Sequence, residues 1–235
     1  MMKAMILAAG LGTRLLPHTS RCPKALVPLA GQPMIAHVLK RFRRYGISNV
    51  VVNLHHFGGQ IQSYLAKPAF SGFHFFYSDE SDLLLDTGGA IKNAAQFFTE
   101  GKPFLVHNCD VISQIPLDRM LMHHHESKAI ATLAVSKRST SRPLAFGRDG
   151  FLRGRYGQTT EHDSIPLAFS GVSILDPVIF TFMPRAKVFS IIDVLIAACT
   201  RFPVVAFEHE PDIWVDAGNI KNFQKAEELL KNVHL

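Results

Sequence analysis

A run of apolar residues near the start of the chain breaks abruptly into a glycine-containing turn. Residues 4–9 read Ala-Met-Ile-Leu-Ala-Ala, and Gly10 and Gly12 follow at once. This pattern is typical of a buried strand that ends in a loop, where glycines let bare backbone N–H groups approach a phosphate. Arg14 and Lys24 add positive charge downstream of the turn. The segment therefore predicts a nucleotide-binding loop at the end of the first strand.

Two common phosphate-binding motifs do not fit this loop. A Walker loop places its lysine directly after a glycine, whereas Lys24 lies far downstream of both glycines. The dinucleotide fingerprint requires a third glycine at the position that Leu15 occupies. An ordinary turn, in which glycines merely supply positive φ, would leave Thr13, Arg14 and the distant Lys24 unexplained.

The rest of the chain alternates strand and helix patterns, as in a parallel sheet with crossover helices. Strands are predicted at 4–9, 49–54, 73–77, 103–107, 129–136, 144–146, 168–175, 204–207 and 213–215. Helices are predicted at 34–45, 59–65, 88–98, 117–126, 190–200 and 219–231. Residues 137–165 are expected to form a less regular insertion over the site. The pattern predicts one Rossmann-like α/β domain over residues 1–235, with a mixed, mostly parallel sheet flanked by helices.

Composition narrows the class of protein further. The 235 residues are 47% hydrophobic, which is enough for a sizeable core, and no apolar run is long enough for a membrane span or resembles a signal peptide. Three cysteines, Cys22, Cys109 and Cys199, have no metal-ligand spacing, which favours a reducing, cytoplasmic location. The net charge of +6 is scattered apart from residues 40–44, opposite an apolar helix face, so no nucleic-acid partner is expected.

Two aspartates stand where a metal ion could bind. Asp110 follows the strand at 103–107, and Asp216 follows the short strand at 213–215. Ligands collect at the carboxyl ends of strands in open parallel sheets, and Mg²⁺ prefers a few carboxylates together with substrate phosphates. The structural alternatives are an Asx turn or helix cap at Asp110, and a carboxylate that complements the dipole of the last helix at Asp216.

A third polar segment precedes the helix predicted at 88–98. Gly88 and Gly89 open that helix, where a ligand could approach the backbone. The Thr87 hydroxyl could bind a base, a sugar or its own helix terminus, and helix capping by Asp86 or Thr87 is the structural alternative. Asn53, at the end of the second strand, is a further candidate for contacting base or sugar, with a turn residue as the alternative.

The longer N-terminal pattern resembles the signature of the sugar-phosphate nucleotidyltransferases. That signature reads Gly-x-Gly-Thr-Arg, a proline three residues on, Pro-Lys, and then Pro-x-x-Gly-x-Pro. The matching residues are Gly10, Gly12, Thr13, Arg14, Pro17, Pro23, Lys24, Pro28, Gly31 and Pro33. One position departs, because many members have proline where Ala25 stands. The resemblance implies the nucleotide-diphospho-sugar transferase fold and transfer of a nucleoside monophosphate from a triphosphate to a sugar 1-phosphate, with release of pyrophosphate.

The resemblance also implies roles for individual residues. Asp110 and Asp216 would hold Mg²⁺, Arg14 would stabilise the leaving pyrophosphate, and Lys24 would contact the transferring or sugar phosphate; Arg14, Lys24 and Asp110 are the catalytic candidates. The nucleotide-binding candidates are Ala8, Ala9, Gly10, Gly12, Thr13, Asn53, Thr87 and Gly88. The sugar-binding candidates are Asp86, Gly89 and Gly171, the last in a Phe-x-Gly strand that lines the sugar pocket of relatives.

The sugar side of the pattern is where the chain departs from its apparent relatives. Many of them have a Glu-Lys-Pro motif whose lysine touches the sugar phosphate, whereas this chain has Glu161, His162 and Asp163. Arg153 and Arg155 are substitutes suggested only by their position. No room is expected after the last helix for the hexapeptide-repeat domain that some relatives carry.

The nucleotide and the sugar stay open at this stage. The Thr-Gly-Gly form of residues 87–89 most resembles the N-acetylmuramate 1-phosphate uridylyltransferases and then the heptose or mannose 1-phosphate guanylyltransferases. UTP is therefore favoured and GTP comes next. A phosphocholine cytidylyltransferase and a regulatory nucleotide-sensing subunit without metal also stay open. The expected partners are a nucleoside triphosphate and a sugar 1-phosphate, without a membrane; the oligomeric state is open.

Overall fold

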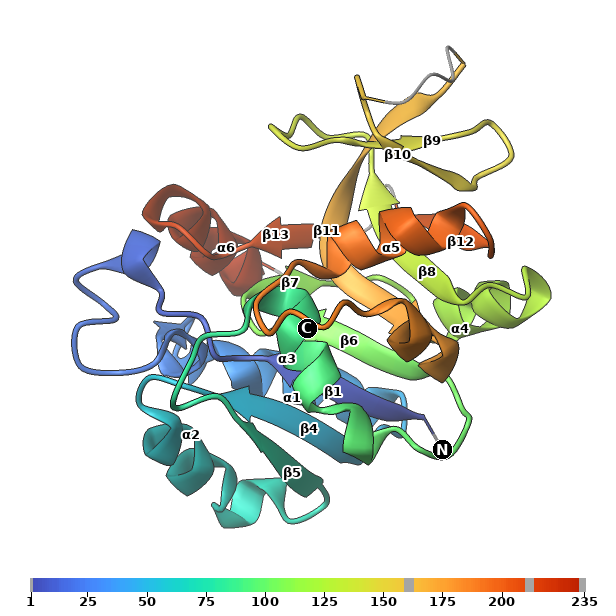
Figure 1. Cartoon of the computed structure of the whole chain (residues 1–235). Coiled ribbons are helices and arrows are strands. Elements are labelled where there is room, and N and C mark those ends of the chain that lie inside the picture. The colour runs from blue at the N-terminus through green and yellow to red at the C-terminus, as the bar shows by residue number, and fades with distance from the viewer. Residues whose placement is uncertain (1, 159–162, 210–213, 233–235) are drawn as a thin grey trace.

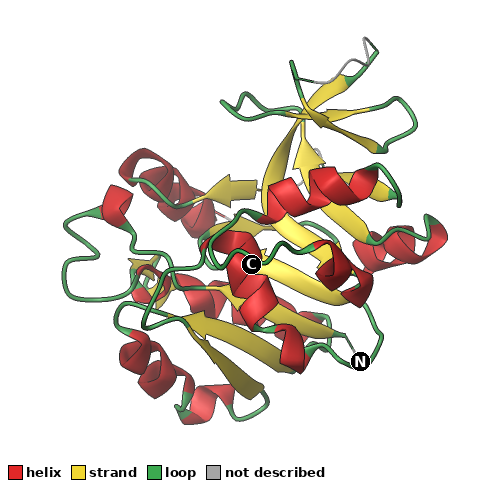
Figure 2. Cartoon of the chain, in the orientation of Figure 1, coloured by secondary structure: helices red, strands yellow, loops and turns green. Residues whose placement is uncertain are grey.

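The first strand of the chain lies between two parallel neighbours that come from far along the sequence. The computed structural model describes residues 2–158, 163–209 and 214–232. Within those ranges a nine-stranded sheet crosses the molecule, with helices on both of its faces (Figure 1, Figure 2). Strand β1 (Lys3–Leu7) pairs in parallel with β4 (Asn49–Leu54) on one side and with β6 (Phe104–Asn108) on the other.

Most strands of this sheet point the same way. Strand β5 continues the parallel arrangement beyond β4, whereas the long strand β11 runs antiparallel to β6. Strand β8 is antiparallel to β11 and so shares the direction of β6, and β12 is parallel to β8. The predicted mixed, mostly parallel sheet flanked by helices is confirmed. The other strands of the sheet are β5 (His74–Asp79), β8 (Ala131–Ser136), β9 (Leu144–Phe146), β10 (Leu152–Arg155), β11 (Ile165–Leu175) and β12 (Val204–Glu208).

The described part of the chain also contains two two-stranded sheets and six α-helices. Strand β7 (Val111–Ser113) pairs antiparallel with β13 (Trp214–Asp216), and β2 (Pro28–Leu29) pairs with β3 (Gln32–Pro33). The helices are α1 (Met34–Arg44), α2 (Gly58–Leu65), α3 (Asp86–Asn93), α4 (Leu117–Glu126), α5 (Ile191–Cys199) and α6 (Ile220–Asn232). None of them is long and apolar enough to cross a lipid bilayer. The cytoplasmic location stays a prediction.

Alternation along the strands divides the apolar side chains between two cores. Ala4 and Ile6 of β1 face a core that they share with α1, α2 and α4. Met5, between them, faces the opposite core, which α3 and α5 cover. A third cluster joins α6 to Leu15 and Val215. The sheet therefore has its faces covered and leaves its strand ends to form a site.

Several predicted elements have other bounds in the structure, and helix α3 differs most. The helix predicted at 88–98 ends at Asn93 and is followed by a separate 3-10 turn at Ala95–Phe97. The Asn93 side chain donates hydrogen bonds to Ser78 Oγ and to the Asp79 carbonyl, at the point where the helix stops. Residues 137–165 include the β9–β10 pair, which projects from one end of the sheet (Figure 1).

Helix α3 packs against the segment before α5 with no room for a side chain at Gly88 or Gly89. A Cβ atom on Gly89 would lie 2.1 Å from the carbonyl oxygen of Lys187, and one on Gly88 would lie 2.5 Å from the ring of Phe189. The N–H groups of Gly88 and Gly89 donate to the Phe189 carbonyl at 2.9 and 3.2 Å. Packing against residues 187–189 therefore requires both glycines.

We expect Gly89→Ala to lower the free energy of unfolding by about 1–3 kcal/mol, because the new methyl group overpacks the contact with Lys187. Gly59, also in a helix, has open space at its Cβ position. Gly59→Ala should therefore be neutral or stabilising by up to about 1 kcal/mol. Urea unfolding followed by circular dichroism measures both, and equal stabilities for the two variants would contradict the packing argument.

Candidate active site

A cavity of about 430 Å³ opens at the carboxyl ends of the parallel strands. Residues at or just after the ends of β1, β4, β5 and β6 contribute to its walls, which is where open parallel sheets bind ligands. The cavity collects nine of the candidate residues from the sequence. These are Ala9, Gly10, Arg14, Lys24, Asn53, Asp86, Thr87, Asp110 and Asp216. The other lining residues are Leu7, Glu80, Leu84, Ala90, Asn108, Cys109 and Val188.

The loop after β1 is shaped by one of its two glycines. Gly12 has a left-handed φ of 66°, and a Cβ atom there would lie 2.7 Å from Thr19 Cγ2. Its carbonyl accepts a hydrogen bond from Thr19 Oγ1 at 2.9 Å. Gly10 lines the cavity and has open space at its Cβ position. The loop is thus folded by Gly12 and presents Gly10 and the exposed Arg14 to the cavity.

Asn53 lines the cavity and connects the ends of three strands. Its Oδ1 accepts the N–H of Ala8 at 2.6 Å, and its Nδ2 donates to Glu80 Oε1 at 2.7 Å. Glu80 Oε2 in turn accepts the N–H of Leu85 at 3.2 Å. Its oxygen and nitrogen both bind protein groups, and the contact with a base or sugar stays a prediction. The N–H of Ala8 is occupied for the same reason.

Glu80 is a carboxylate of this cavity that the sequence analysis missed. It is buried, and burial raises the pKa of its carboxyl group above the ordinary value, against the hydrogen bond from Asn53. The signal was present, because Glu80 directly follows β5. The strand-end argument that selected Asp110 selects this residue equally well.

Three charged side chains converge at the other end of the cavity. Lys24 Nζ donates a hydrogen bond to Asp110 Oδ2. A Cβ atom on Gly218 would lie 2.7 Å from Asp110 Oδ2, 2.7 Å from Asp216 Oδ1 and 3.0 Å from Lys24 Nζ. Because both carboxylate oxygens lie 2.7 Å from the same point, the distance between them is at most twice 2.7 Å. Gly218 was not among the predicted site residues, yet any side chain there would occupy their meeting point.

The charges in this cluster shift one another's pKa values. Burial acts to raise the pKa of Asp110, but the Lys24 ammonium outweighs it and holds the value below the ordinary range. Burial acts to lower the pKa of Lys24, and the Asp110 carboxylate reverses the effect and raises it. For Asp216, burial and then the Asp110 charge raise the pKa. Two carboxylates thus share one ammonium group, so the net charge of the three groups is negative when both carboxylates are ionised.

This excess of negative charge fits a divalent cation. Mg²⁺ commonly takes one or two protein carboxylates and completes its octahedron with water and substrate phosphates. In the described residues no third His, Cys, Asp or Glu side chain joins the pair to make a larger ligand cluster. Asp110 and Asp216 are therefore suited to hold a metal that arrives with a phosphate-bearing substrate.

The segment at 86–89 serves the protein's own packing more than was predicted. Thr87 Oγ1 accepts the N–H of Ile191 at 3.0 Å, and Asp86 Oδ1 accepts the N–H of Thr87 at 2.5 Å. The backbone N–H groups of Gly88 and Gly89 are not available to a ligand in this structure, because both donate to the Phe189 carbonyl. Only Asp86 and Thr87 of this segment line the cavity.

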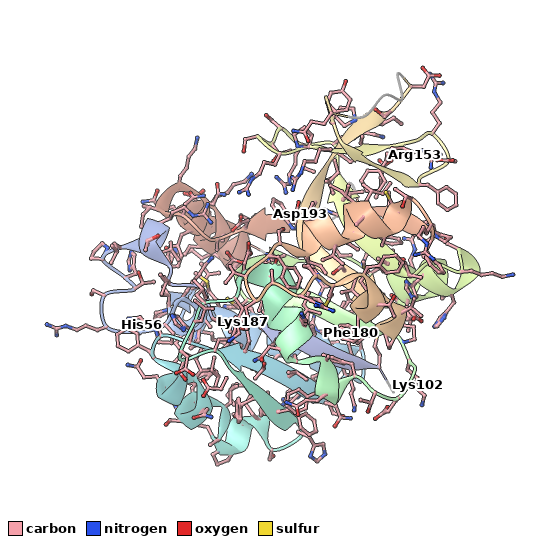
Figure 3. All side chains as sticks on the ribbon, in the orientation of Figure 1. His56, Lys102, Arg153, Phe180, Lys187 and Asp193 are labelled. Atoms are coloured by element: carbon pink, nitrogen blue, oxygen red, sulfur yellow. The ribbon has the colours of Figure 1, made fainter. Side chains whose placement is uncertain are left out.

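Of the three sugar-binding candidates, Asp86 lines the cavity, whereas Gly89 and Gly171 do not. Gly171 has a φ of 73°, and a Cβ atom there would lie 2.8 Å from Asn108 Nδ2, so backbone packing requires this glycine. Arg153 and Arg155 form ion pairs of 2.5 Å with Asp149 and Asp193, and Figure 3 shows Arg153 on the projecting hairpin. In the described residues neither arginine lines the cavity.

Four further predicted positions do not line the cavity. Ala8, Gly12 and Thr13 belong to the loop after β1, and Gly88 packs against Phe189. Glu161 and His162, which replace the expected Glu-Lys-Pro motif, lie outside the described residues, and Asp163 is exposed.

Comparison with known proteins points in one direction. A family model described as nucleotidyl transferase matches residues 3–151. The N-acetylmuramate alpha-1-phosphate uridylyltransferase of Neisseria meningitidis serogroup B is 30% identical over 97% of this chain and 98% of the relative. The mannose-1-phosphate guanylyltransferase catalytic subunit beta of Dictyostelium discoideum is 28% identical over 94% of this chain, which spans 62% of that protein.

Solved structures agree at the level of the fold. A UTP-bound UGPase from Acinetobacter baumannii superposes with a TM-score of 0.84 and 18% sequence identity. The match covers 98% of this chain and 94% of that one. At this identity the likeness shows a shared fold.

We expect Asp216→Asn to stabilise the metal-free protein at pH 7 by roughly 1 kcal/mol, because it removes a carboxylate whose pKa is raised by burial and by Asp110. Such a group costs stability when it is ionised, and the cost disappears as the pH falls and the carboxyl is protonated in both states. The difference between variant and wild type should therefore begin to shrink as the pH falls through the raised pKa of Asp216, and it should vanish below about pH 4. Urea unfolding in the presence of a chelator measures it; a variant less stable at pH 7 would refute the assignment of strain to this pair.

Proposed function

Since the chain belongs to the nucleotidyl transferase family, we propose that it transfers a nucleoside monophosphate from a nucleoside triphosphate to a sugar 1-phosphate. Pyrophosphate is released and a nucleotide sugar is formed. The observation that carries the proposal is the convergence of Lys24, Asp110 and Asp216 beside the loop that presents Gly10 and Arg14. This arrangement places positive charge and two metal-binding carboxylates at one end of a cavity.

The reaction needs little from the protein beyond position and charge. An oxygen of the sugar phosphate, already an anion, attacks the α-phosphorus in line, and the bond to pyrophosphate breaks. No general base is required for an attacking group that carries no proton. A covalent route through Cys109 is unfavourable, because burial and the Asp110 charge raise the pKa of its thiol to about 12.

The residues at the charged end divide the work. Lys24, held by Asp110 in the structure, has further N–H donors for a phosphate oxygen of either substrate. Arg14, exposed at the edge of the cavity, neutralises charge that develops on the leaving pyrophosphate. Asp110 and Asp216 would hold Mg²⁺, which would supply further neutralisation of phosphate charge.

The opposite end of the cavity is left for the nucleoside. It is lined by Leu84, Thr87 and the carboxylate of Glu80, which offers hydrogen-bond acceptors. We favour UTP, because residues 87–89 read Thr-Gly-Gly and a relative aligned over nearly the whole chain is a uridylyltransferase. A guanylyltransferase is the second candidate, supported by the likeness to the Dictyostelium protein.

A panel of four nucleoside triphosphates against several sugar 1-phosphates, scored by pyrophosphate release with and without Mg²⁺, tests the proposal. We expect release that depends on Mg²⁺ and is fastest with UTP. Fastest release with GTP would favour the guanylyltransferase, and release only with CTP and phosphocholine would favour the cytidylyltransferase. Binding of a triphosphate without release from any pair would indicate a regulatory subunit and contradict the proposal.

We expect Asp110→Asn to fold normally and to lose at least about a hundredfold in turnover, because a neutral amide holds the metal and Lys24 poorly. Asp118→Asn is the matched control, since Asp118 is exposed on α4. Its turnover should equal that of the wild type. Initial rates of pyrophosphate release under saturating substrates measure both, and turnover near the wild-type rate for Asp110→Asn would remove Asp110 from the metal site.

A further inference from the structure

A second cavity, of about 260 Å³, adjoins the one described above at Asp216. Its walls include Arg138 from the end of β8, Trp214 from β13, and Asn222 and Lys225 from α6. Asp216 belongs to both cavities. Whatever occupies the second cavity therefore lies next to the carboxylate that we assign to the metal.

Arg138 is held in place by contacts that leave part of its guanidinium unused. The group lies 4.1 Å from the centre of the Trp214 ring, and its Nη2 donates to the Phe169 carbonyl at 2.6 Å. Its Nε is buried and has no hydrogen-bond partner, and no carboxylate of the described residues forms an ion pair with it. Arg153 and Arg155, in contrast, are both neutralised by aspartates.

A half-buried cation that has no carboxylate partner among the described residues is costly for a protein that binds nothing there. Burial lowers the pKa of Arg138, and the Asp216 charge only partly opposes this. Lys225, exposed on α6, adds a second positive charge to the cavity wall. Stacked guanidinium groups are preorganised for planar or tetrahedral oxyanions, so the arrangement fits an anionic ligand.

The strand geometry directs that ligand toward the reaction. Trp214 and Asp216 are two residues apart on β13, so their side chains lie on the same face of the strand. A molecule resting on Trp214 and bound by Arg138 can therefore extend to Asp216. The first cavity, with its Gly10 loop, accommodates the triphosphate, which leaves the second cavity for the acceptor.

We propose that Arg138 binds an anionic oxygen group of the acceptor, either its phosphate or a carboxylate on its sugar. The inference rests on the proposed function, which it deepens by assigning the acceptor to the cavity between Trp214 and α6. Arg138 then determines acceptor affinity, whereas the triphosphate is bound by other residues.

The chain carries its own probe for the test, because Trp214 is its single tryptophan. Glucose 1-phosphate and glucuronic acid 1-phosphate are titrated while Trp214 fluorescence is recorded, with and without a non-hydrolysable UTP analogue and Mg²⁺. The variants are Arg138→Gln and Arg138→Lys. Arg148→Gln is the control, since Arg148 is exposed in the turn between β9 and β10.

We expect Arg138→Gln to weaken acceptor binding, and to raise its KM, by about ten- to a hundredfold, as for loss of charged hydrogen bonds. Arg138→Lys should recover part of the loss, and Arg148→Gln should match the wild type. The KM for the triphosphate should stay within about twofold in every variant, a split that a merely structural role would not produce.

The two acceptors distinguish the anion that is bound. Equal losses for both place the phosphate on Arg138, and a loss confined to glucuronic acid 1-phosphate places the carboxylate there. Unchanged affinity for both, or no binding of either to the wild type, overturns the inference. Because fluorescence does not require turnover, turnover without an Arg138 effect leaves the proposed function intact, whereas Arg138-dependent binding without turnover contradicts only the proposed function.

Discussion

The site depends on two carboxylates and one ammonium that are buried together at the end of the sheet. Asp110 lies two residues after the end of β6, and the β7–β13 pair places Asp216 opposite Val111, the residue after Asp110. The N–H of Ala217 donates to the Asp110 carbonyl at 2.9 Å, which fixes the two segments against each other. The absence of a side chain at Gly218 leaves the space in which the three charges meet. Backbone pairing thus forces two like charges together.

The arrangement trades stability for charge. Lys24 compensates one carboxylate, and the well-packed sheet around the cluster offsets the cost of the remaining negative charge. The polar contacts of Asn53 keep the first loop, β4 and the buried Glu80 in fixed relation, so the cavity is largely preformed. Arg138, on the far side of Asp216, brings a second uncompensated charge of the opposite sign. We infer that a bound metal ion offsets the negative charge of the two carboxylates and that an anionic substrate offsets the charge of Arg138.

Local sequence patterns sufficed where one element determined the outcome. The alternation of strands and helices predicted the sheet. The strand-end argument selected Asp110 and Asp216, the N-terminal motif selected Arg14 and Lys24, and all four line one cavity. Contacts between distant segments were beyond such patterns. The sequence around Gly88 and Gly89 predicted a ligand-binding turn. In the structure these glycines pack against the Lys187–Phe189 segment, almost a hundred residues away. No local pattern indicated that Arg138 stacks on Trp214, because the two residues are far apart in the sequence.

A crystal structure with a non-hydrolysable UTP analogue and Mn²⁺ tests the central claim most directly, because manganese is located by its anomalous scattering. We expect a peak within about 2.0–2.3 Å of an oxygen of both Asp110 and Asp216, with Lys24 turned to a phosphate oxygen. A manganese ion bound by the phosphates alone, with Lys24 still on Asp110 and Asp216 without a ligand, would contradict the account.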